Sequence, residues 1–453
     1  MSINMSKGLR FILQSGTDTI TTLGAQPVSS GAIASSPPIW SVTQFNVFES
    51  NDSARVKAIR NKIIPLRKNR STEYGATWQI INGEIAIGAI GYCETDTDAD
   101  LVIEAVFECY GNPDSATYKV EVLDGANMLL GSSEEVLVST SGDVYKFAVP
   151  SFKMAKGFFQ SELRFRWRYR VRSAFGSGIT QTMAVPFYNF PLRPQLPWVW
   201  DSKSDNNPWT DALDLLWEKG RSEFAKMKEV CEQAEIAEVV TKIVNSKVGL
   251  VYEDRLGASQ FGIDAFDVSD FLSVVIDEKQ KVSNRANDVG FLVNCTDCAS
   301  AVTTFSNLFG GSLYNVKFGT ISPAETQSEG RTIFIKFRCN EVRTLGASKC
   351  EAPFKRPMSN GGFGYHEVSM FGEYAHTSSI YDACLEVNEN VINIPNVRKP
   401  RLPTNLRFSS SSSYLKRITQ NDIQYYIEWL VYNRTNHLNT ATLYANVGVR
   451  NIK

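Results

Sequence analysis

The N-terminal part of the chain alternates short runs of β-branched and aromatic residues with turn-forming residues. No stretch of helical periodicity interrupts this pattern between Thr77 and Phe190, and turn sequences such as Gly-Asn-Pro-Asp at 111–114 separate the runs. The pattern predicts strands over residues 78–92, 101–110, 116–123, 144–149, 163–171 and 180–190. Strands at this spacing favour an all-β sandwich of jelly-roll type over residues 41–196.

The residues that precede this sandwich are rich in Ser, Thr, Gly and Ala and end in Pro37-Pro38. We expect residues 1–40 to form an extended N-terminal arm with at most a short strand. A basic stretch follows over residues 50–70 and is typical of a solvated loop or short helix.

One predicted strand alternates strictly between apolar residues and arginines. The odd positions from Leu163 to Val171 are apolar, and every even position from Arg164 to Arg172 is arginine. Successive side chains of a strand point to opposite faces, so the five arginines share one face. We expect them either to pair with acidic residues on adjacent strands or to bind an anionic ligand, a glycan or a partner chain.

The hydrophobic pattern changes period after a proline-rich, polar segment that predicts a linker over residues 197–208. Apolar residues then recur at helical spacing, first from Trp209 to Trp217 and then from Ile236 to Val244. A short strand over 250–252 and a helix over 268–276 follow. Mixed elements of this kind predict an α+β domain over residues 209–390, and residues 391–453 form a C-terminal β-rich extension whose strands complete a sheet of either domain or form an interaction module.

Cys295 directly precedes an apolar helix that Gly310-Gly311 should end. The N-terminus of a helix carries a partial positive charge and unsatisfied N–H groups, and both favour a thiolate. The thiolate is the nucleophilic form of cysteine, and the same N–H groups can stabilise an oxyanion. Cys295 is therefore the candidate nucleophile, with its own backbone N–H as the default oxyanion donor.

A glycine-rich loop leads into a predicted strand that carries His366, and Asp382 follows 16 residues later, a spacing that suits adjacent antiparallel strands. His376 and His437 lie in polar segments and fit a catalytic role less well. We expect Cys295, His366 and Asp382 to form a triad within hydrogen-bond reach in a solvent-open cleft.

This order of residues resembles the transglutaminase-like superfamily of papain-fold cysteine enzymes, many bacterial members of which carry Cys-x-Asp-x-Ala at the nucleophile. The corresponding residues here are Cys295, Asp297 and Ala299, followed by His366 and Asp382. The resemblance runs from residue 209 to 382 and implies a papain-like α+β fold. It implies that the cysteine attacks a carboxamide or peptide carbonyl, the histidine acts as base and the aspartate orients it. The resemblance also implies a bacterial or phage origin, and an effector or toxin is one role that fits it.

Other assignments of the same residues remain open. Cys298, one turn after Cys295, is the alternative nucleophile, although the motif favours Cys295. Cys295 and Cys298 also have the spacing of half a zinc site, but no second close cysteine pair follows. Tyr365 and Asp297 are candidate supporting residues. The whole domain is alternatively a non-catalytic binding or structural module of a particle or secreted assembly.

Composition narrows the classes of partner. Lys and Arg total 47 against 48 Asp and Glu, so no global field attracts nucleic acid or an anionic membrane. No apolar run has the length of a membrane span or a signal peptide, which predicts a cytoplasmic protein or export without a cleaved signal. Eight cysteines spread over 453 residues predict mostly reduced thiols. We expect a protein or peptide substrate, no cofactor and no metal.

Overall fold

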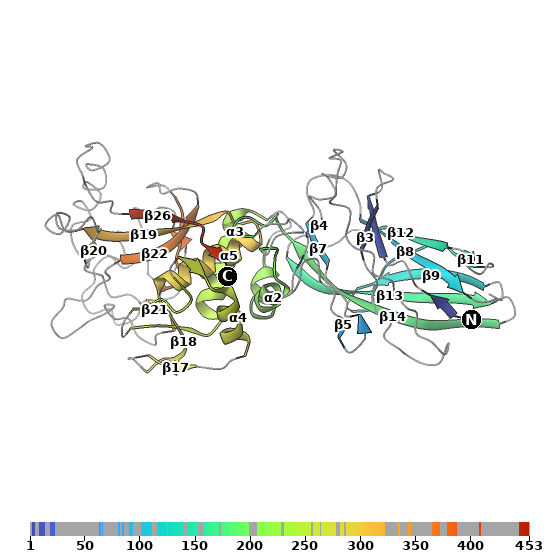
Figure 1. Cartoon of the computed structure of the whole chain (residues 1–453), viewed down its shortest axis with the longest axis horizontal. Helices are drawn as coiled ribbons and strands as arrows, with labels where there is room; N and C mark the ends of the chain where they lie inside the picture. Colours follow the sequence, from blue (N-terminus) through green and yellow to red (C-terminus); the bar gives the residue numbers. More distant parts are fainter. Residues whose placement is uncertain are drawn as a thin grey trace. The chain divides into compact units, whose positions relative to one another are not determined.

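The chain forms two compact units in the computed structural model (Figure 1). The first contains Met1–Arg193 and Trp200–Leu213, and the second contains Pro194–Val199 and Asp214–Lys453. The residues that the structure describes are 2–4, 9–13, 19–22, 63–64, 66, 80–81, 84–85, 90–93, 101–110, 116–124, 126–138, 144–152, 158–171, 174–198, 206–227, 231–254, 257–262, 264–277, 281–284, 287–321, 334–335, 343–346, 365–371, 378–386, 407–408 and 444–452.

One sheet of the first unit is built around β8 (Leu101–Tyr110). Its antiparallel neighbours are β1 (Ser2–Asn4), β2 (Leu9–Leu13) and β12 (Val144–Phe152), and β3 (Thr19–Thr22) pairs with β2. The N-terminal residues predicted as an extended arm thus contribute three strands, which corrects that prediction. Ser2–Asn4 and Thr19–Thr22 are short and mostly polar, whereas Leu9–Leu13 is mostly apolar and lies between β8 and β3.

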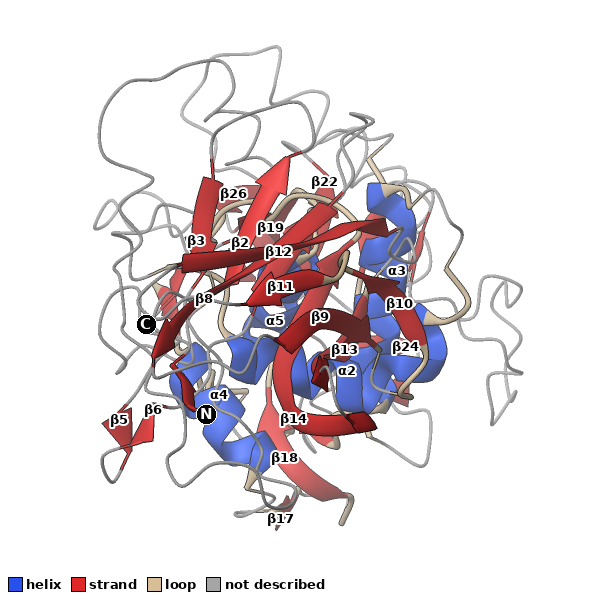
Figure 2. Ribbon diagram, turned by 90° about the vertical axis from the view of Figure 1, so that its right-hand side faces the viewer, coloured by secondary structure: helices blue, strands red, loops and turns tan. Residues whose placement is uncertain are grey.

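The other sheet of the first unit contains the two longest described strands, β13 (Phe159–Val171) and β14 (Ala174–Phe190), and β14 curves strongly in Figure 2. Its strand order is β10-β9-β13-β14-β7-β4, with β11 also paired to β9. The remaining strands are β4 (Ile63–Ile64), β7 (Ile90–Cys93), β9 (Ala116–Leu123), β10 (Leu129–Ser132) and β11 (Val136–Val138). The jelly-roll sandwich stays a prediction.

The structure bears on two of the strands predicted in this unit. The single strand predicted over 78–92 is divided into β5 (Ile80–Ile81), β6 (Glu84–Ile85) and β7, because Asn82-Gly83 forms the kind of pair that turns a hairpin. The arginine-bearing strand lies beside β9, where the register places Glu121 opposite Arg166. The arginine side chains themselves lie outside the described residues, so both interpretations of that face stay open.

Among the described residues, four helices lie in or enter the second unit, and α5 is at its centre (Figure 1). Asn294 caps α5 at its start, and all 14 residues of the helix are buried. Phe271 of α4 and Phe305 of α5 pack with ring centroids 5.6 Å apart, and Phe266 contacts both. The helices are α2 (Thr210–Phe224), which crosses the boundary between the units, α3 (Gln233–Ser246), α4 (Val268–Ile276) and α5 (Cys295–Leu308).

An antiparallel sheet packs against α5 through β19 and β22. Its order is β20-β19-β22-β23-β25, and β26 also pairs with β19. The strands are β19 (Leu313–Ile321), β20 (Phe334–Ile335), β22 (Tyr365–Phe371), β23 (Ile380–Tyr381), β25 (Arg407–Phe408) and β26 (Tyr444–Gly448). The C-terminal strands therefore complete the sheet of the second unit, which selects one of the predicted alternatives.

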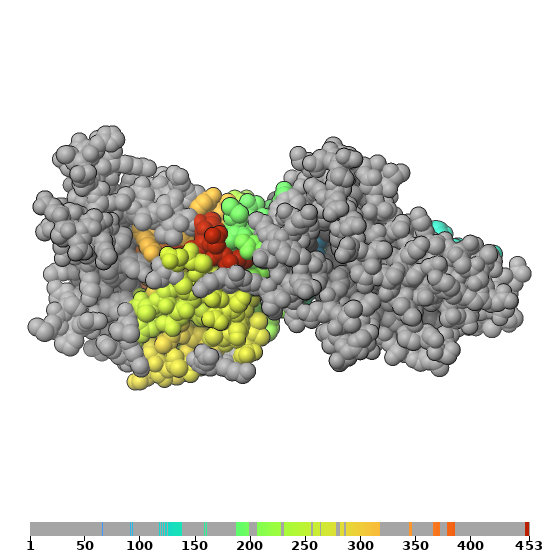
Figure 3. Space-filling model, in the orientation of Figure 1, coloured from blue at the N-terminus to red at the C-terminus, as the bar shows by residue number. Residues whose placement is uncertain are grey.

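Seven further short strands described in the second unit pair with one another outside this sheet. The strands are β15 (Leu250–Tyr252), β16 (Ala265–Phe266), β17 (Val282–Ser283), β18 (Val289–Val293), β21 (Arg343–Thr344), β24 (Leu385–Glu386) and β27 (Asn451–Ile452). β15 pairs with β18, β18 with β17, β21 with β24, and β16 with β27. The C-terminal residues, red in Figure 3, accordingly lie against yellow-green parts of the second unit.

The predicted linker begins with residues that pack onto the second unit. Trp198 is buried, and its indole Nε1–H donates to the Thr304 carbonyl oxygen at 2.7 Å. The Gln195 amide donates to the Asn307 carbonyl oxygen at 2.8 Å. An aromatic residue between prolines thus anchors the chain on α5, which composition alone does not reveal. No described helix has the length and apolar character needed to cross a membrane.

Candidate active site

Cys295 occupies the first position of the nucleophile helix. Asn294 caps α5 by accepting from the Asp297 amide at 3.0 Å, and the Asp297 side chain accepts from the Asn294 amide at 3.0 Å. This reciprocal capping box fixes the first turn of the helix. The amides of Asn294 and Asp297 are engaged in the box, so neither can meet an oxyanion, and the Cys295 amide stays the default donor.

Asp297, a predicted supporting residue, holds a loop against the start of α5. Its carboxylate accepts from Ser259 Oγ at 2.6 Å and from the amides of Gln260 and Phe261 at 2.9 and 3.0 Å, besides that of Asn294. Burial raises the pKa of Asp297, while these hydrogen bonds act in the opposite direction. Asp297 therefore connects loop 257–262 to the nucleophile turn, and Asn294 Nδ2 adds a hydrogen bond to the Gly257 carbonyl oxygen at 2.9 Å.

His366 and Asp382 meet across two neighbouring strands. His366 lies on β22, and Asp382 directly follows β23, which pairs antiparallel with β22. The imidazole Nε2 lies 2.9 Å from Asp382 Oδ2. Asp382 Oδ1 accepts from the amides of Cys384 and Leu385 at 2.7 and 3.1 Å. Both carboxylate oxygens are thus held, so the carboxylate can orient the imidazole.

The electrostatics of the cluster favour a charged imidazole. Burial by itself would lower the pKa of His366, but the charge and hydrogen bond of Asp382, together with the nearby Cys295 sulfur, raise it to about 10. The structure therefore brings Cys295, His366 and Asp382 together. Because Nε2 faces Asp382, Nδ1 is the ring nitrogen left to exchange a proton with the thiol, and in this structure Nδ1 is buried without a hydrogen-bond partner.

Two further thiols lie beside the triad and have a different character. Cys298 and Cys384 are fully buried and hydrogen-bonded to each other, and burial raises the pKa of each thiol. A thiol whose pKa is raised is a poor nucleophile near neutral pH. The raised pKa of its thiol makes Cys298 a weak candidate for the reactive cysteine.

The described part of the chain contains no cluster of three or more His, Cys, Asp or Glu side chains arranged to hold a metal ion. The zinc alternative would complete the Cys295–Cys298 pair with Cys339, Cys350 or His366; Cys339 and Cys350 lie outside the described residues, as do His376, His437 and the Tyr365 side chain.

The triad is buried, unlike the open cleft that the sequence led us to expect. Cys295 is 4% exposed, His366 0% and Asp382 2%. A macromolecular substrate would therefore need a local opening at the start of α5 before its carbonyl carbon could reach the sulfur atom. The structure also reveals a buried ion pair beside the triad, Glu367 with Arg450, that the sequence analysis did not find.

No protein-family model matches the chain, and no curated protein matches it either.

Proposed function

We propose that the second unit is a cysteine-nucleophile hydrolase or acyltransferase that acts on an amide or peptide carbonyl through a thioester. The observation that carries this proposal is the Asp382–His366 contact of 2.9 Å, coupled to a cysteine at a helix N-terminus. A thiol, a base and a group that orients the base are the minimum set for this chemistry. The resemblance to the transglutaminase-like superfamily supports the same reaction and a papain-like fold.

In the proposed reaction, the Cys295 thiolate attacks the carbonyl carbon, and the oxygen takes the electron pair as an oxyanion near the Cys295 amide. The tetrahedral intermediate collapses as the His366 imidazolium gives its proton to the leaving nitrogen, which departs as an amine or ammonia. Neutral His366 then accepts a proton from the second nucleophile as that nucleophile attacks the thioester. Water gives a carboxylic acid, and an amine gives a new amide, with the thiolate released in both cases.

The burial of the triad favours one alternative, a non-catalytic binding or structural module that keeps the same residues as part of its core. Under this alternative, Cys295 would never meet a carbonyl, although the His366–Asp382 pair would still stabilise the fold. In either case, we propose that the first unit binds the target, and the face of Arg164–Arg172 is its candidate surface for an anionic or glycan partner. An effector or toxin role belongs to the same proposal.

Hydroxylamine distinguishes the two functions without knowledge of the substrate. It attacks a thioester and leaves a hydroxamate on the acyl group, whichever nucleophile normally completes the reaction. Full-length protein and its Cys295→Ala variant would each be incubated with a mixture of proteome-derived peptides and hydroxylamine, and the peptides analysed by mass spectrometry. The proposal predicts hydroxamates at glutamine side chains or new C-termini with the wild type only. Equal peptide spectra from the two proteins would contradict it.

A further inference from the structure

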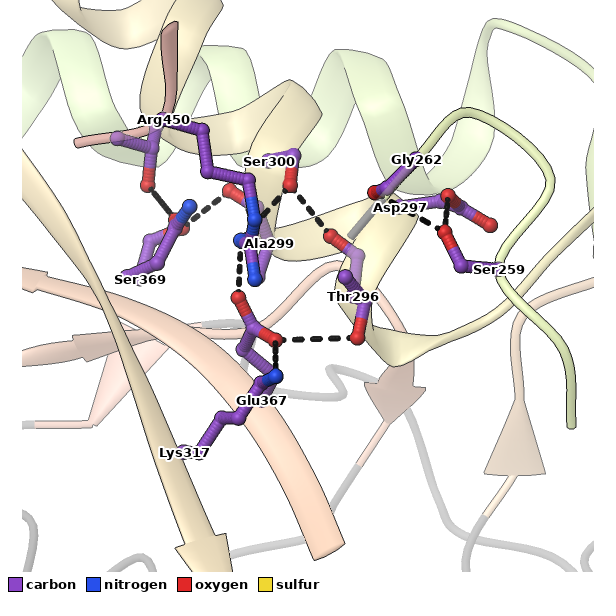
Figure 4. Close-up of polar contacts among 12 residues, drawn as sticks. Ser259, Gly262, Thr296, Asp297, Ala299, Ser300, Lys317, Glu367, Ser369 and Arg450 are labelled. Carbon is purple, nitrogen blue, oxygen red and sulfur yellow. Dashed lines mark hydrogen bonds and ion pairs between the residues drawn. The ribbon is translucent and has the colours of Figure 1, made fainter. Parts of the chain in front are cut away.

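A buried polar network joins the C-terminal segment to the nucleophile turn (Figure 4). Arg450 Nη1 donates to Glu367 Oε1 and, at 3.0 Å, to Ser300 Oγ. Thr296 Oγ1 donates to Glu367 Oε2 at 3.0 Å, and Lys317 Nζ lies 3.7 Å from the same oxygen. Both oxygens of the Glu367 carboxylate are therefore held by groups from other elements.

The Asn315 amide belongs to the same network. With its nitrogen turned toward the Ala299 carbonyl oxygen at 3.0 Å, its oxygen accepts from Arg450 Nη1 at 2.7 Å. Ser300 Oγ in turn donates to the Thr296 carbonyl oxygen at 2.7 Å. Arg450 thus contacts α5 one turn after the nucleophile, while it also contacts two strands of the sheet.

Two residues of the network are sequence neighbours of triad residues. Thr296 follows Cys295 on α5, and Glu367 follows His366 on β22. The hydrogen bond between Thr296 and Glu367 therefore links the helix that carries the thiol to the strand that carries the imidazole. A shift of either element along the other would break this bond.

The burial of the pair needs an explanation other than stability. Glu367 is 1% and Arg450 3% exposed. Removing two charges from water costs free energy that their attraction offsets only in part, and apolar residues of similar volume often stabilise a core equally well. A buried ion pair is better suited to holding two elements in a fixed arrangement and to determining the electrostatic potential nearby. A nucleophilic thiolate depends on both the arrangement and the potential.

We propose that Glu367 and Arg450 are positioning residues for the nucleophile, because they lock the first turn of α5 to β22 and set the charge around Cys295. This inference rests on the proposed function of the triad. It extends that function to a residue at the C-terminal end of the chain, 83 positions from its partner.

Opposite charges in the pair predict opposite effects on the thiolate. Without the positive charge of Arg450, the negative charge of Glu367 is less fully balanced, and a thiolate nearby is less stable. Labelling of Cys295 by iodoacetamide should therefore require a higher pH. Removing the negative charge of Glu367 should have the reverse effect. The other titratable or charged groups around Cys295 and its turn stay in place in both variants, and they are His366, Asp382, Asp297, Cys298, Cys384, Lys317 and Glu253.

The test is the pH profile of Cys295 labelling by limiting iodoacetamide, followed by peptide mass spectrometry. We expect Arg450→Gln to move the half-maximal pH upward by about one pH unit and Glu367→Gln to move it downward by about the same amount. Arg450→Lys keeps the charge and should restore the wild-type midpoint. Lys242→Gln, which removes a cation from the exposed pair with Glu238, is the matched control and should change nothing.

A purely structural role would lower the stability of both variants without opposite shifts, so shifts in one direction or none would overturn the inference. If Arg450→Gln does not fold, the double variant Glu367→Gln/Arg450→Gln, compared with Glu367→Gln alone, reports the same Arg450 effect and should lie at higher pH. Failure of the proposed function looks different, because wild-type Cys295 would then show no labelling at low pH for any variant to shift.

Discussion

Replacement of Asp382 by asparagine isolates the charge that holds His366 protonated. The side-chain oxygen of the introduced asparagine can still accept from the amides of Cys384 and Leu385, as Asp382 Oδ1 does. Its nitrogen can donate to His366 Nε2, so the loop keeps its shape while the carboxylate charge is lost. The substitution also favours the wrong tautomer, because a neutral imidazole that accepts at Nε2 must carry its proton on Nδ1.

The size of the effect follows from the pKa of His366. With Asp382 ionised, that pKa is about 10. Without the carboxylate, burial opposes the charge, and the pKa should fall toward its ordinary value near 6.5. A fall of this size corresponds to about 5 kcal/mol of lost preference for the imidazolium. At pH 8, the ring should therefore change from almost fully charged to mostly neutral.

Carbon-13 labelling of the three histidines makes this change visible by NMR. The His366 signal is assigned from its absence in a His366→Gln variant. Wild-type His366 should show no titration between pH 6 and 8, whereas Asp382→Asn should show a midpoint in or below that range. Asp267→Asn, the same substitution at the cap of α4, is the control and should leave the signal unchanged. Identical His366 titrations in wild type and Asp382→Asn would refute the electrostatic argument.

Three further predictions concern stability, and urea unfolding measures each of them. Asp297→Ala removes the acceptor of four hydrogen bonds and should lower the free energy of unfolding by about 3 kcal/mol, and no loss would show that loop 257–262 is held by other contacts. Trp198→Ala should cost about 3–5 kcal/mol by leaving a cavity against α5, whereas a loss below about 1 kcal/mol would place this segment in a loose linker. Because the folded pKa of His366 lies above its unfolded value, its contribution is complete below about pH 6.5 and is lost as the pH rises toward 10. His366→Gln should flatten this part of the stability profile, and parallel profiles would contradict the raised pKa.

Local signals in the sequence account for much of the candidate site. The apolar spacing and the closing glycines of α5 placed Cys295 at a helix start, where the structure has it. The 16-residue interval between His366 and Asp382 indicated adjacent strands, and their side chains meet at 2.9 Å. These features are readable because each depends on residues close together in the chain.

Features that depend on contacts between residues far apart in the chain could not be predicted from the sequence. Glu367 and Arg450 are single charges 83 residues apart, and nothing in either segment indicates that they pair. The burial of the triad likewise results from the packing of whole elements. In the first unit, the three N-terminal strands were missed because β1 and β2 pair with β8, which lies far along the chain, and because β1 and β3 are short and polar.

The most direct test of the account compares thiols within one protein. Limiting iodoacetamide at pH 6 to 7 would be applied to the wild type and to His366→Ala, with each cysteine quantified by peptide mass spectrometry. Cys231 is the internal reference, because it is more exposed than Cys295, yet burial and Glu235 raise the pKa of its thiol. The account predicts that Cys295 is labelled faster than Cys231 in the wild type and loses this advantage in His366→Ala. Equal labelling of Cys295 in the wild type and in His366→Ala would contradict a histidine-activated nucleophile.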